Sequence, residues 1–483
     1  MHWVLSLLFP LFFSFGNIKK IIFGQPSSVS RRTCPNKQVG DMLFNRRLHC
    51  WLSFTTLVST CCYTWSEHAA SAEAITASKL LKNWSRKAEE DARLFDRLPQ
   101  HDELFLTPPQ VIRKRGYPVE IHHVTTDDGY ILELHRIPAK PLNDGSPRKA
   151  VFIHHGVIES SGTWLVNPSS LALPFLLADQ SYDVWLGNFR GNRYSRRHVQ
   201  LSPKQSKFWQ FSWDEIGNFD IPAIINHILT LTGLPTMSYI GHSLGCGVFF
   251  IAMVKHPELN AKIDTMVALA PLSSFANFKT PIYRALAPFS RPIEAFLKKI
   301  GIWGWLDSDG LGDVLLKSAC SPTYKQAKFC RYLLGLVTGH NRENIHPSIV
   351  ALAVTNIFRG TSVQVIAQFG QNYLAGETFQ AYDYGKKGNL KRYGSPEPYE
   401  YLLGKITAPV YVFSGGNDLL VTPEDVDWLL TQLTNLKGSV RIPEYSHMDF
   451  LWVFANLKFN LQLNLMLSFG RGLTSKKKST IQS

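Results

Sequence analysis

The sequence predicts an α/β fold, in which helices cover both faces of a mostly parallel central sheet and a helical domain is inserted between two of its strands. Three observations support this prediction. Apolar strands alternate with helical segments from about residue 107 to residue 271. This alternation stops between about residues 272 and 401, where helical patterns, aromatic residues, proline and glycine prevail. Strand patterns then return at Pro409–Ser414 and Val440–Tyr445.

The elements before the insertion follow one another closely along the chain. Asp127-Asp128-Gly129 separates two apolar runs and predicts a hairpin turn. The predicted strands are Glu120–Thr126, Tyr130–Ile137, Lys149–His154, Tyr182–Asn188, Met237–Ile240 and Thr265–Pro271, and the predicted helices are Leu171–Leu177, Trp213–Leu231 and Leu244–Lys255. In the insertion, apolar residues recur at i, i+3, i+4 and i+7, which predicts one apolar helix face made of Ile293, Phe296, Leu297 and Ile300.

Composition indicates a globular chain. Of the 483 residues, 45% are hydrophobic and 18% are charged, which is enough to bury one large core or two ordinary ones. The formal net charge is +14, but the excess is spread along the chain, and its one run, Lys476–Lys478, lies in a polar tail. A solvated surface therefore explains the charge better than a nucleic-acid partner does, and weak attraction to anionic lipid surfaces stays open.

The N-terminal region is typical of a secretory signal peptide. Arg46 and Arg47 precede an apolar run that ends in small residues near Ala72. We expect residues 42–74 to be a signal peptide and residues 1–41 an upstream extension; a retained anchor is the alternative. The remaining predicted parts are an N-terminal segment at 75–106, the first part of the core at 107–271, the inserted domain at 272–401, the second part of the core at 402–470 and a basic tail at 471–483.

Removal of the signal peptide would leave three cysteines. Cys320 and Cys330 lie close in sequence and could pair in an oxidising compartment. Cys246 falls in an apolar helix and is expected to be a buried free thiol. Asn83 begins the one glycosylation sequon, which matters only if the chain is secreted.

Gly241-His242-Ser243-Leu244-Gly245 matches the pattern G-x-S-x-G between a predicted strand and a predicted helix. That context is what a nucleophilic serine on a tight strand-to-helix turn requires, as in the α/β-hydrolase fold. A serine hydroxyl is a weak nucleophile at neutral pH, so it needs a base, and the base needs an acid to orient it. We therefore interpret Ser243 as a nucleophile.

The acid and the histidine are identified by their positions after the last two strands, because this fold orders its residues as Ser, acid, His. Asp418 follows the strand Pro409–Ser414, whereas its rivals Asp425 and Asp427 fall inside the next helix, on a face expected to be solvated. His447 follows the final strand. Asp418 is therefore the predicted orienting acid and His447 the predicted general base.

Two backbone N–H groups are needed to bind the oxyanion of a tetrahedral intermediate. Leu244, directly after the nucleophile, is one predicted donor. Val157, in the loop that begins His155-Gly156, is the other. Only the backbone of this loop is needed, so His155 itself can be a core histidine.

No metal or nucleotide cofactor is predicted. The histidine pairs His122-His123 and His154-His155 lie on strands, where adjacent side chains point to opposite faces. No glycine-rich phosphate-binding pattern follows a strand.

With these residues in place, the chain resembles the acid lipase family, which includes gastric and lysosomal acid lipases. The resemblance runs from about Thr107 to about Val453. The segments that carry it are Gly116-Tyr117-Pro118, Thr126-Asp127-Asp128-Gly129-Tyr130-Ile131-Leu132, His155-Gly156, Asp183-Val184-Trp185-Leu186-Gly187-Asn188, Arg190-Gly191-Asn192, Phe219-Asp220-Ile221-Pro222-Ala223, Gln380-Ala381-Tyr382-Asp383-Tyr384-Gly385, Gly416-Asn417-Asp418-Leu419-Leu420 and His447-Met448-Asp449-Phe450.

The resemblance implies an α/β-hydrolase core with a cap, part of which acts as a lid. It implies cofactor-free hydrolysis of triacylglycerols or cholesteryl esters at a lipid–water interface or membrane surface. It also implies a secreted or lysosomal protein with N-glycans and one disulfide in the cap, which would be Cys320–Cys330 here. Within the cap, the segment Pro292–Leu306 would shape the lid or acyl pocket, or else pack as ordinary cap core.

The sequence departs from the family pattern at Leu244, where most members carry glutamine, and after Val453, where the similarity fades. Two other functions stay open. One is a carboxylesterase for small esters, and the other is a catalytically silent lipid-binding or storage protein on the same scaffold. The second usually lacks a catalytic residue, whereas Ser243, Asp418 and His447 are all present.

Overall fold

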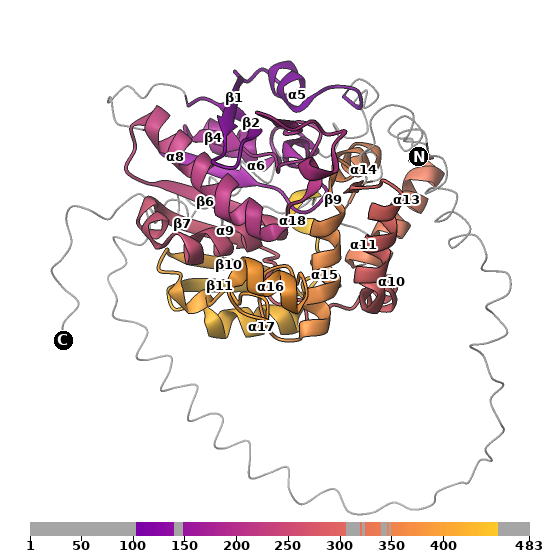
Figure 1. The fold of residues 1–483 in the computed structure, drawn as a ribbon. Helices are drawn as coiled ribbons and strands as arrows, with labels where there is room; N and C mark the ends of the chain where they lie inside the picture. The colour runs from indigo at the N-terminus through magenta and orange to yellow at the C-terminus, as the bar shows by residue number, and fades with distance from the viewer. Residues whose placement is uncertain are drawn as a thin grey trace, which may run out of the picture. The chain divides into compact units, whose positions relative to one another are not determined.

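The computed structural model of the protein describes most of the predicted core and cap (Figure 1). It covers residues 103–139, 148–305, 319–320, 324–339, 345–346 and 349–452. These residues all belong to one compact unit, Ala77–Ser483. The predicted extension at 1–41, the signal peptide at 42–74, the sequon at Asn83 and the tail at 471–483 lie outside the described residues. Within the described ranges, no helix has the length and apolar character needed to cross a lipid bilayer.

The predicted α/β fold with a mostly parallel sheet is confirmed. The main sheet has the strand order β1-β2-β4-β3-β6-β7-β10-β11, with the short β5 paired to β2. Pairs from β4 to β11 are parallel, whereas β2 runs antiparallel to its neighbours. The strands are β1 (Glu120–Thr125), β2 (Tyr130–Ile137), β3 (Ala150–His154), β4 (Asp183–Leu186), β5 (Arg197–His198), β6 (Met237–His242), β7 (Ile263–Leu269), β10 (Val410–Gly415) and β11 (Leu436–Ile442), with β8 (Gly304–Trp305) and β9 (Thr361–Ser362) in a separate sheet.

Both faces of the sheet are buried, which explains why its central strands are apolar at nearly every position. In β3, Phe152 packs into a cluster with side chains of α8 and α9, and Val151 and Ile153 pack into a second cluster with α5 and α6. The helices are α5 (Pro108–Lys114), α6 (Leu173–Asp179), α7 (Trp213–Glu215), α8 (Ile221–Thr232), α9 (Leu244–Lys255), α10 (Pro281–Leu286), α11 (Ser290–Lys299), α13 (Tyr324–Thr338), α14 (Val350–Ile357), α15 (Val363–Ala375), α16 (Lys386–Tyr393), α17 (Pro423–Gln432) and α18 (Asp449–Trp452).

Shorter turns link these elements. The 3₁₀ turns are η1 (Ser161–Leu165), η2 (Ser206–Trp209), η4 (Pro257–Lys262), η5 (Ala287–Phe289) and η7 (Leu403–Lys405). The helix predicted from Trp213 to Leu231 is continuous but not α-helical throughout, because the π-helix η3 (Ile216–Asp220) lies between α7 and α8. Pro222 has no N–H to donate to the carbonyl of Asn218, and His256 Nε2 lies 3.0 Å from that oxygen instead.

The helical insertion falls between β7 and β10, as predicted, while its limits at 272 and 401 stay predictions. The predicted apolar face of its first long helix is not buried as a unit. Leu297 is buried where α11 packs against α15, but Phe296 is 58% exposed and Ile300 52% exposed. Helical periodicity shows that residues share one face of a helix, but it does not show whether that face is buried or exposed.

Among the described residues, two cysteines form a disulfide and a third is a buried free thiol. Cys320 and Cys330 form a disulfide that ties the middle of the cap helix α13 to the preceding segment. Cys246 is buried in α9, with its sulfur 3.7 Å from the carbonyl oxygen of Leu269. Burial raises the pKa of the Cys246 thiol, so this side chain packs as a small apolar group.

Three separate sequence segments meet at one buried guanidinium. Arg190 is fully buried and makes two-pronged contacts with Asp128 of the β1–β2 hairpin, at 2.6 and 2.9 Å. Its Nε also lies 2.9 Å from Asp220 of η3, and its guanidinium stacks 4.0 Å from the ring centre of Tyr130. These contacts fix the hairpin and η3 to the loop after β4.

Replacing Arg190 with methionine should lower the free energy of unfolding by about 3–5 kcal/mol, because it leaves two carboxylates without their cation in a buried site. Urea unfolding measured by circular dichroism tests this. The control is Arg197→Met, since Arg197 is half exposed and its Nη2 lies 3.8 Å from Glu133. It should cost less than about 1 kcal/mol. Equal losses in the two variants would contradict the anchoring role of Arg190.

Candidate active site

Ser243 lies on a sharp turn between β6 and α9. Its backbone has φ +53° and ψ −119°, a conformation that non-glycine residues rarely adopt. The Ser243 N–H donates to the carbonyl of Leu269 at the end of β7, and the Ser243 carbonyl accepts from the N–H of Leu272. The turn is therefore held by the end of β7 and by the segment that follows it.

The two glycines around Ser243 allow β6 and α9 to come this close. A Cβ on Gly245 would lie 2.6 Å from the carbonyl oxygen of His154 and 2.7 Å from that of His155. A Cβ on Gly241 would lie 2.9 Å from the backbone nitrogen of Cys246. The start of α9 thus rests directly on the end of β3.

The structure brings Ser243, His447 and Asp418 together. His447 Nε2 lies 2.9 Å from Ser243 Oγ, and its Nδ1 lies 2.8 Å from Asp418 Oδ2. The other carboxylate oxygen, Asp418 Oδ1, accepts N–H bonds from Leu420 and Val421 at 2.8 and 2.9 Å. All three side chains are buried. This is the arrangement in which an oriented imidazole can remove a proton from a serine.

The rival carboxylates lie elsewhere. Asp425 accepts from Ser274 and from the backbone of Asn277, so it joins α17 to the segment after β7. The expectation that it is solvated was wrong, because these contacts bury it. Asp427 is exposed, as expected, and pairs with Arg441 at 2.6 Å.

The predicted oxyanion donors lie at the expected junctions. Leu244 is the first residue of α9, where a helix N–H has no partner within the helix. Val157 follows β3 in a loop whose next residue, Ile158, has φ +58°. That conformation is strained for a β-branched residue, and the N–H of Arg359 donates to the carbonyl of Ile158 to hold it.

His155 is a core histidine with its hydrogen bonds satisfied, as the second interpretation of this residue had it. Its Nδ1 lies 2.7 Å from the carbonyl oxygen of Gly156, and its Nε2 accepts the N–H of Phe189 at 3.2 Å. Burial lowers its pKa to about 3, so it stays neutral. Its role is to fasten the loop after β3 to the loop after β4.

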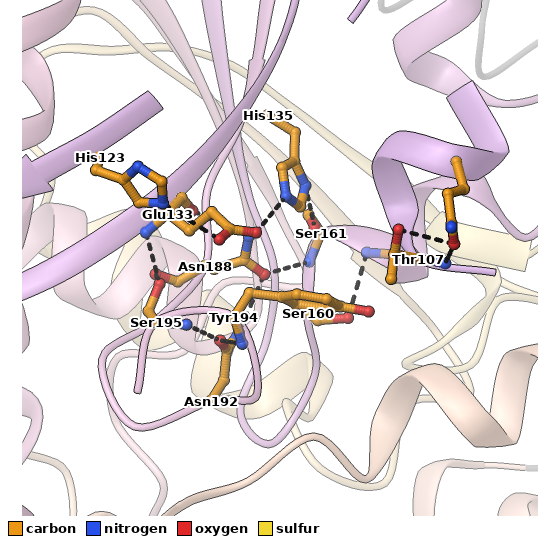
Figure 2. Close-up of polar contacts among 12 residues, drawn as sticks. Thr107, His123, Glu133, His135, Ser160, Ser161, Asn188, Asn192, Tyr194 and Ser195 are labelled. Carbon is orange, nitrogen blue, oxygen red and sulfur yellow. Dashed lines mark hydrogen bonds and ion pairs between the residues drawn. The ribbon is translucent and has the colours of Figure 1, made fainter. Parts of the chain in front are cut away.

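A buried polar network holds the loop after β4 in place. Figure 2 shows side chains from β2, from the turn before η1 and from the loop after β4 pointing toward one another; they include Glu133, His135, Ser160, Ser161, Asn188, Asn192 and Ser195. Asn188 Oδ1 accepts the N–H of Ser161 at 3.0 Å, and Asn188 Nδ2 donates to the carbonyl of Glu133 at 3.0 Å. Asn192 Nδ2 lies 3.1 Å from Asn188 Oδ1.

Two contributors to the site carry no sequence signal that we could use. The first is the C-terminal end of the cap helix α13, where the carbonyl of Thr338 accepts the N–H of His447 at 3.1 Å. The following Gly339 has φ +107°, and a Cβ there would lie 2.0 Å from the carbonyl oxygen of Asn417. The second is the buried pair Glu159 and His242, beside His447.

Among the described residues, no group of three histidine, cysteine or acidic side chains is placed to hold a metal ion. The site contains a candidate nucleophile, a candidate base, a candidate orienting acid and two candidate oxyanion donors.

Comparison with known proteins identifies the family. The family models described as "Partial alpha/beta-hydrolase lipase region" and "alpha/beta hydrolase fold" match residues 108–168 and 149–296. The chain is 38% identical to the gastric triacylglycerol lipase of Bos taurus over 362 residues, which are 74% of this chain and 89% of the relative. It is 38% identical to the human lysosomal acid lipase/cholesteryl ester hydrolase over 352 residues, which are 71% of this chain and 86% of the relative. The chain belongs to the acid lipase family.

A further relative extends the range of organisms. Lipase lipl-1 of Caenorhabditis elegans is 37% identical over 357 residues, which are 72% of this chain and 88% of the relative. Family membership makes this protein a lipase of the α/β-hydrolase fold, and thus a hydrolase of carboxylic esters. The expected fold and family are confirmed; the roles of individual residues stay proposals.

Gly245→Ala should abolish activity, because its Cβ would collide with two carbonyl oxygens that cannot move without distorting β3. A displacement of the nucleophile by about 1 Å costs on the order of 100-fold in rate. Hydrolysis of a soluble ester by purified protein is the measurement. Gly404→Ala is the control, since the nearest atom to its Cβ would be Thr434 Cγ2 at 3.7 Å. Full activity in Gly245→Ala would show that the crossing of β6 and α9 is less tight than described.

Proposed function

We propose that this protein is a serine lipase that hydrolyses the ester bonds of neutral lipids through an acyl-enzyme intermediate. The observation that carries the proposal is the hydrogen-bonded chain from Ser243 Oγ through the His447 imidazole to Asp418. The acid lipase relatives supply the substrate class, since two of them are named as triacylglycerol and cholesteryl ester hydrolases. Triacylglycerols and cholesteryl esters are therefore the proposed substrates, without a cofactor.

The mechanism follows from which atoms face one another. Ser243 Oγ attacks the acyl carbonyl carbon while His447 Nε2 takes the hydroxyl proton. Asp418 holds Nδ1–H, so that Nε2 presents its lone pair, and it stabilises the imidazolium that forms. His447 then gives the proton to the departing alcohol. Water, activated by the same imidazole, releases the fatty acid and restores Ser243.

Charge on the substrate oxygen develops during attack and needs donors already in place. The N–H groups of Leu244 and Val157 are the proposed donors. Leu244 is the first residue of α9, so the positive end of the helix dipole adds to its hydrogen bond. Because the donor is a backbone group, the leucine side chain at this position should not weaken catalysis.

Ser243→Ala should lower kcat/KM by at least about 10⁴-fold, and Asp418→Asn by a similar factor, because each removes one member of the triad. The measurement is hydrolysis of glyceryl and cholesteryl esters with short and long acyl chains, at acid and neutral pH. Long-chain activity that vanishes in Ser243→Ala supports a lipase. Activity confined to short soluble esters would indicate a small-ester carboxylesterase, and no activity in the wild type would indicate a lipid-binding scaffold.

An apolar surface on the cap fits the proposed encounter with a lipid–water interface. Along α10, η5 and α11 (Figure 1), several large apolar side chains are exposed, and we call this set the α10–α11 stripe; its members are Ile282, Tyr283, Leu286, Phe289, Phe296 and Ile300, between 41% and 58% exposed. Arg284, Arg291 and Lys299 lie in the same helices. Apolar rows with nearby cations are typical of helices that lie on lipid surfaces.

Replacing Phe289 and Phe296 together with serine should slow hydrolysis of a phosphatidylcholine-stabilised triolein emulsion by at least about tenfold, since burying one phenylalanine in lipid is worth about 1.5–3 kcal/mol. Hydrolysis of a soluble short-chain ester should be unchanged. Leu231→Ser, which removes an exposed leucine from α8 in the core, is the matched control. Equal emulsion rates in all three proteins would exclude the stripe as the lipid-contacting surface.

The proposed setting is the secretory pathway, with a final location that is extracellular or lysosomal. The Cys320–Cys330 disulfide suits an oxidising compartment. Residues 42–74 would direct the chain there, and Asn83 would then be available for a glycan. N-terminal sequencing of the secreted protein tests this, because a mature chain that begins before residue 70 is incompatible with the proposed cleavage near Ala72 or Ala74.

A further inference from the structure

A buried carboxyl group lies behind the catalytic histidine. Glu159 is 3% exposed and follows the strained Ile158 in the loop that carries Val157. Its Oε2 accepts the N–H of Gly156 at 3.2 Å, within the same loop. Its Oε1 lies 3.7 Å from Nδ1 of His242, the residue before the nucleophile.

His242 connects this carboxyl group to the catalytic loop. Its Nε2 lies 2.9 Å from the carbonyl oxygen of His447, and its ring lies 4.9 Å from the His447 ring, centre to centre. A carbonyl oxygen can only accept, so Nε2 must carry a hydrogen. In a neutral imidazole Nδ1 is then a bare lone pair, and it has no hydrogen-bond partner among the described residues.

The two groups therefore lack a proton between them when Glu159 is ionised. An ionised carboxylate has only acceptor oxygens, so Oε1 and Nδ1 would face each other as two lone pairs. A protonated carboxyl would instead donate O–H to Nδ1 as the two atoms close from 3.7 Å. Burial raises the pKa of Glu159 to about 7 and lowers that of His242 well below its usual range, so the proton resides on Glu159 in acid.

We propose that Glu159 and His242 are positioning residues that share one proton, and that this shared proton fastens the His447 loop to the oxyanion loop. The connection runs from the Gly156 N–H through Glu159 and His242 to the His447 carbonyl. It joins the loop of His447 to the loop of Val157. The distance between these loops decides whether the base and the oxyanion donor can act on the same substrate molecule. Loss of the proton above neutral pH loosens that connection and sets the alkaline limit of activity.

Polar and charged groups from several neighbouring elements surround Glu159 and His242. His447 faces this pair from the loop before α18 and is itself paired with Asp418. His155, directly after β3, is neutral and adds no charge beside the pair. The Asn192 amide donates to the backbone carbonyl of Glu159. Arg359 contacts the loop through its backbone bond to Ile158.

An electrostatic effect of Glu159 on His447 opposes this positioning effect but is weaker. An ionised Glu159 would attract the His447 imidazolium that forms during catalysis, which would favour activity above neutral pH. Asp418 already provides that stabilisation at 2.8 Å, so a second, more distant carboxylate adds little. A shift of the base or the oxyanion donors by about 1 Å costs on the order of 100-fold. We therefore expect positioning to dominate.

The test is the pH profile of kcat and KM on a soluble ester for the wild type and Glu159→Gln. The glutamine side chain can donate N–H to Nδ1 at every pH. The wild type should lose at least tenfold in kcat above about pH 7, whereas Glu159→Gln should retain its kcat there, with little change in KM. Glu294→Gln replaces another buried carboxyl group, in α11, and should follow the wild-type profile.

A stability measurement checks the titration independently of catalysis. Glu159 has an ordinary pKa of 4.5 when unfolded and about 7 when folded, so ionisation favours the unfolded chain between these values. The wild-type melting temperature should therefore fall relative to that of Glu159→Gln as pH rises from 4.5 to 7. Parallel changes of melting temperature with pH would show that folding does not raise the pKa of Glu159 and would overturn the proposal.

This inference rests on the proposed function, and the two can fail separately. An active Ser243→Ala variant would overturn the serine mechanism. An inactive Ser243→Ala variant with Glu159→Gln following the wild-type profile would overturn only the shared proton. A wild-type kcat that rises above pH 7 and falls in Glu159→Gln would assign Glu159 an electrostatic role and likewise overturn it.

Discussion

The packing of α9 onto the end of β3 is the constraint on which the rest of the site depends. Gly245 lies against the carbonyl oxygens of His154 and His155, and no side chain would fit between them. This close contact places Ser243, the Leu244 N–H and the start of the Val157 loop at the end of β3. The strained backbone of Ser243 is held by hydrogen bonds to Leu269, at the end of β7, and to Leu272, in the segment after it.

The loops around that contact are kept in place by buried polar groups rather than by apolar packing. The Asn188 and Asn192 amides bridge the loop after β4 to β2, to η1 and to His155. Arg190, between these two asparagines, forms ion pairs with aspartates from two other segments. Such networks are costly when partly satisfied and rigid when complete, which suits a loop that must present a backbone N–H in one direction.

The fold and the close approach of Ser243, His447 and Asp418 could be predicted because they depend on chain order. Ser243 lies in a local pattern, and Asp418 and His447 each follow a late strand at the edge where parallel strands end. The rest depends on contacts between distant segments. Glu159 is an ordinary loop residue until folding brings it to His242. The start of β11 was missed because Lys437, Gly438 and Ser439 carry no apolar side chain, and the backbone pairing with β10 does not require one. The π-helix needed the combined effect of Pro222 and His256.

The junction between α13 and the catalytic loops bears on how this family can be recombined. The carbonyl of Thr338 holds the His447 backbone, and Thr280 donates to the carbonyl of Val337 while its neighbour Lys279 binds Leu419 in the acid loop. The last turn of a cap helix is thus part of the framework of the active centre. A cap grafted from a relative would alter the backbone around His447 and Asp418 unless this turn and Thr280 were kept from the recipient protein. The natural boundary for exchanging substrate-binding regions therefore lies inside α13.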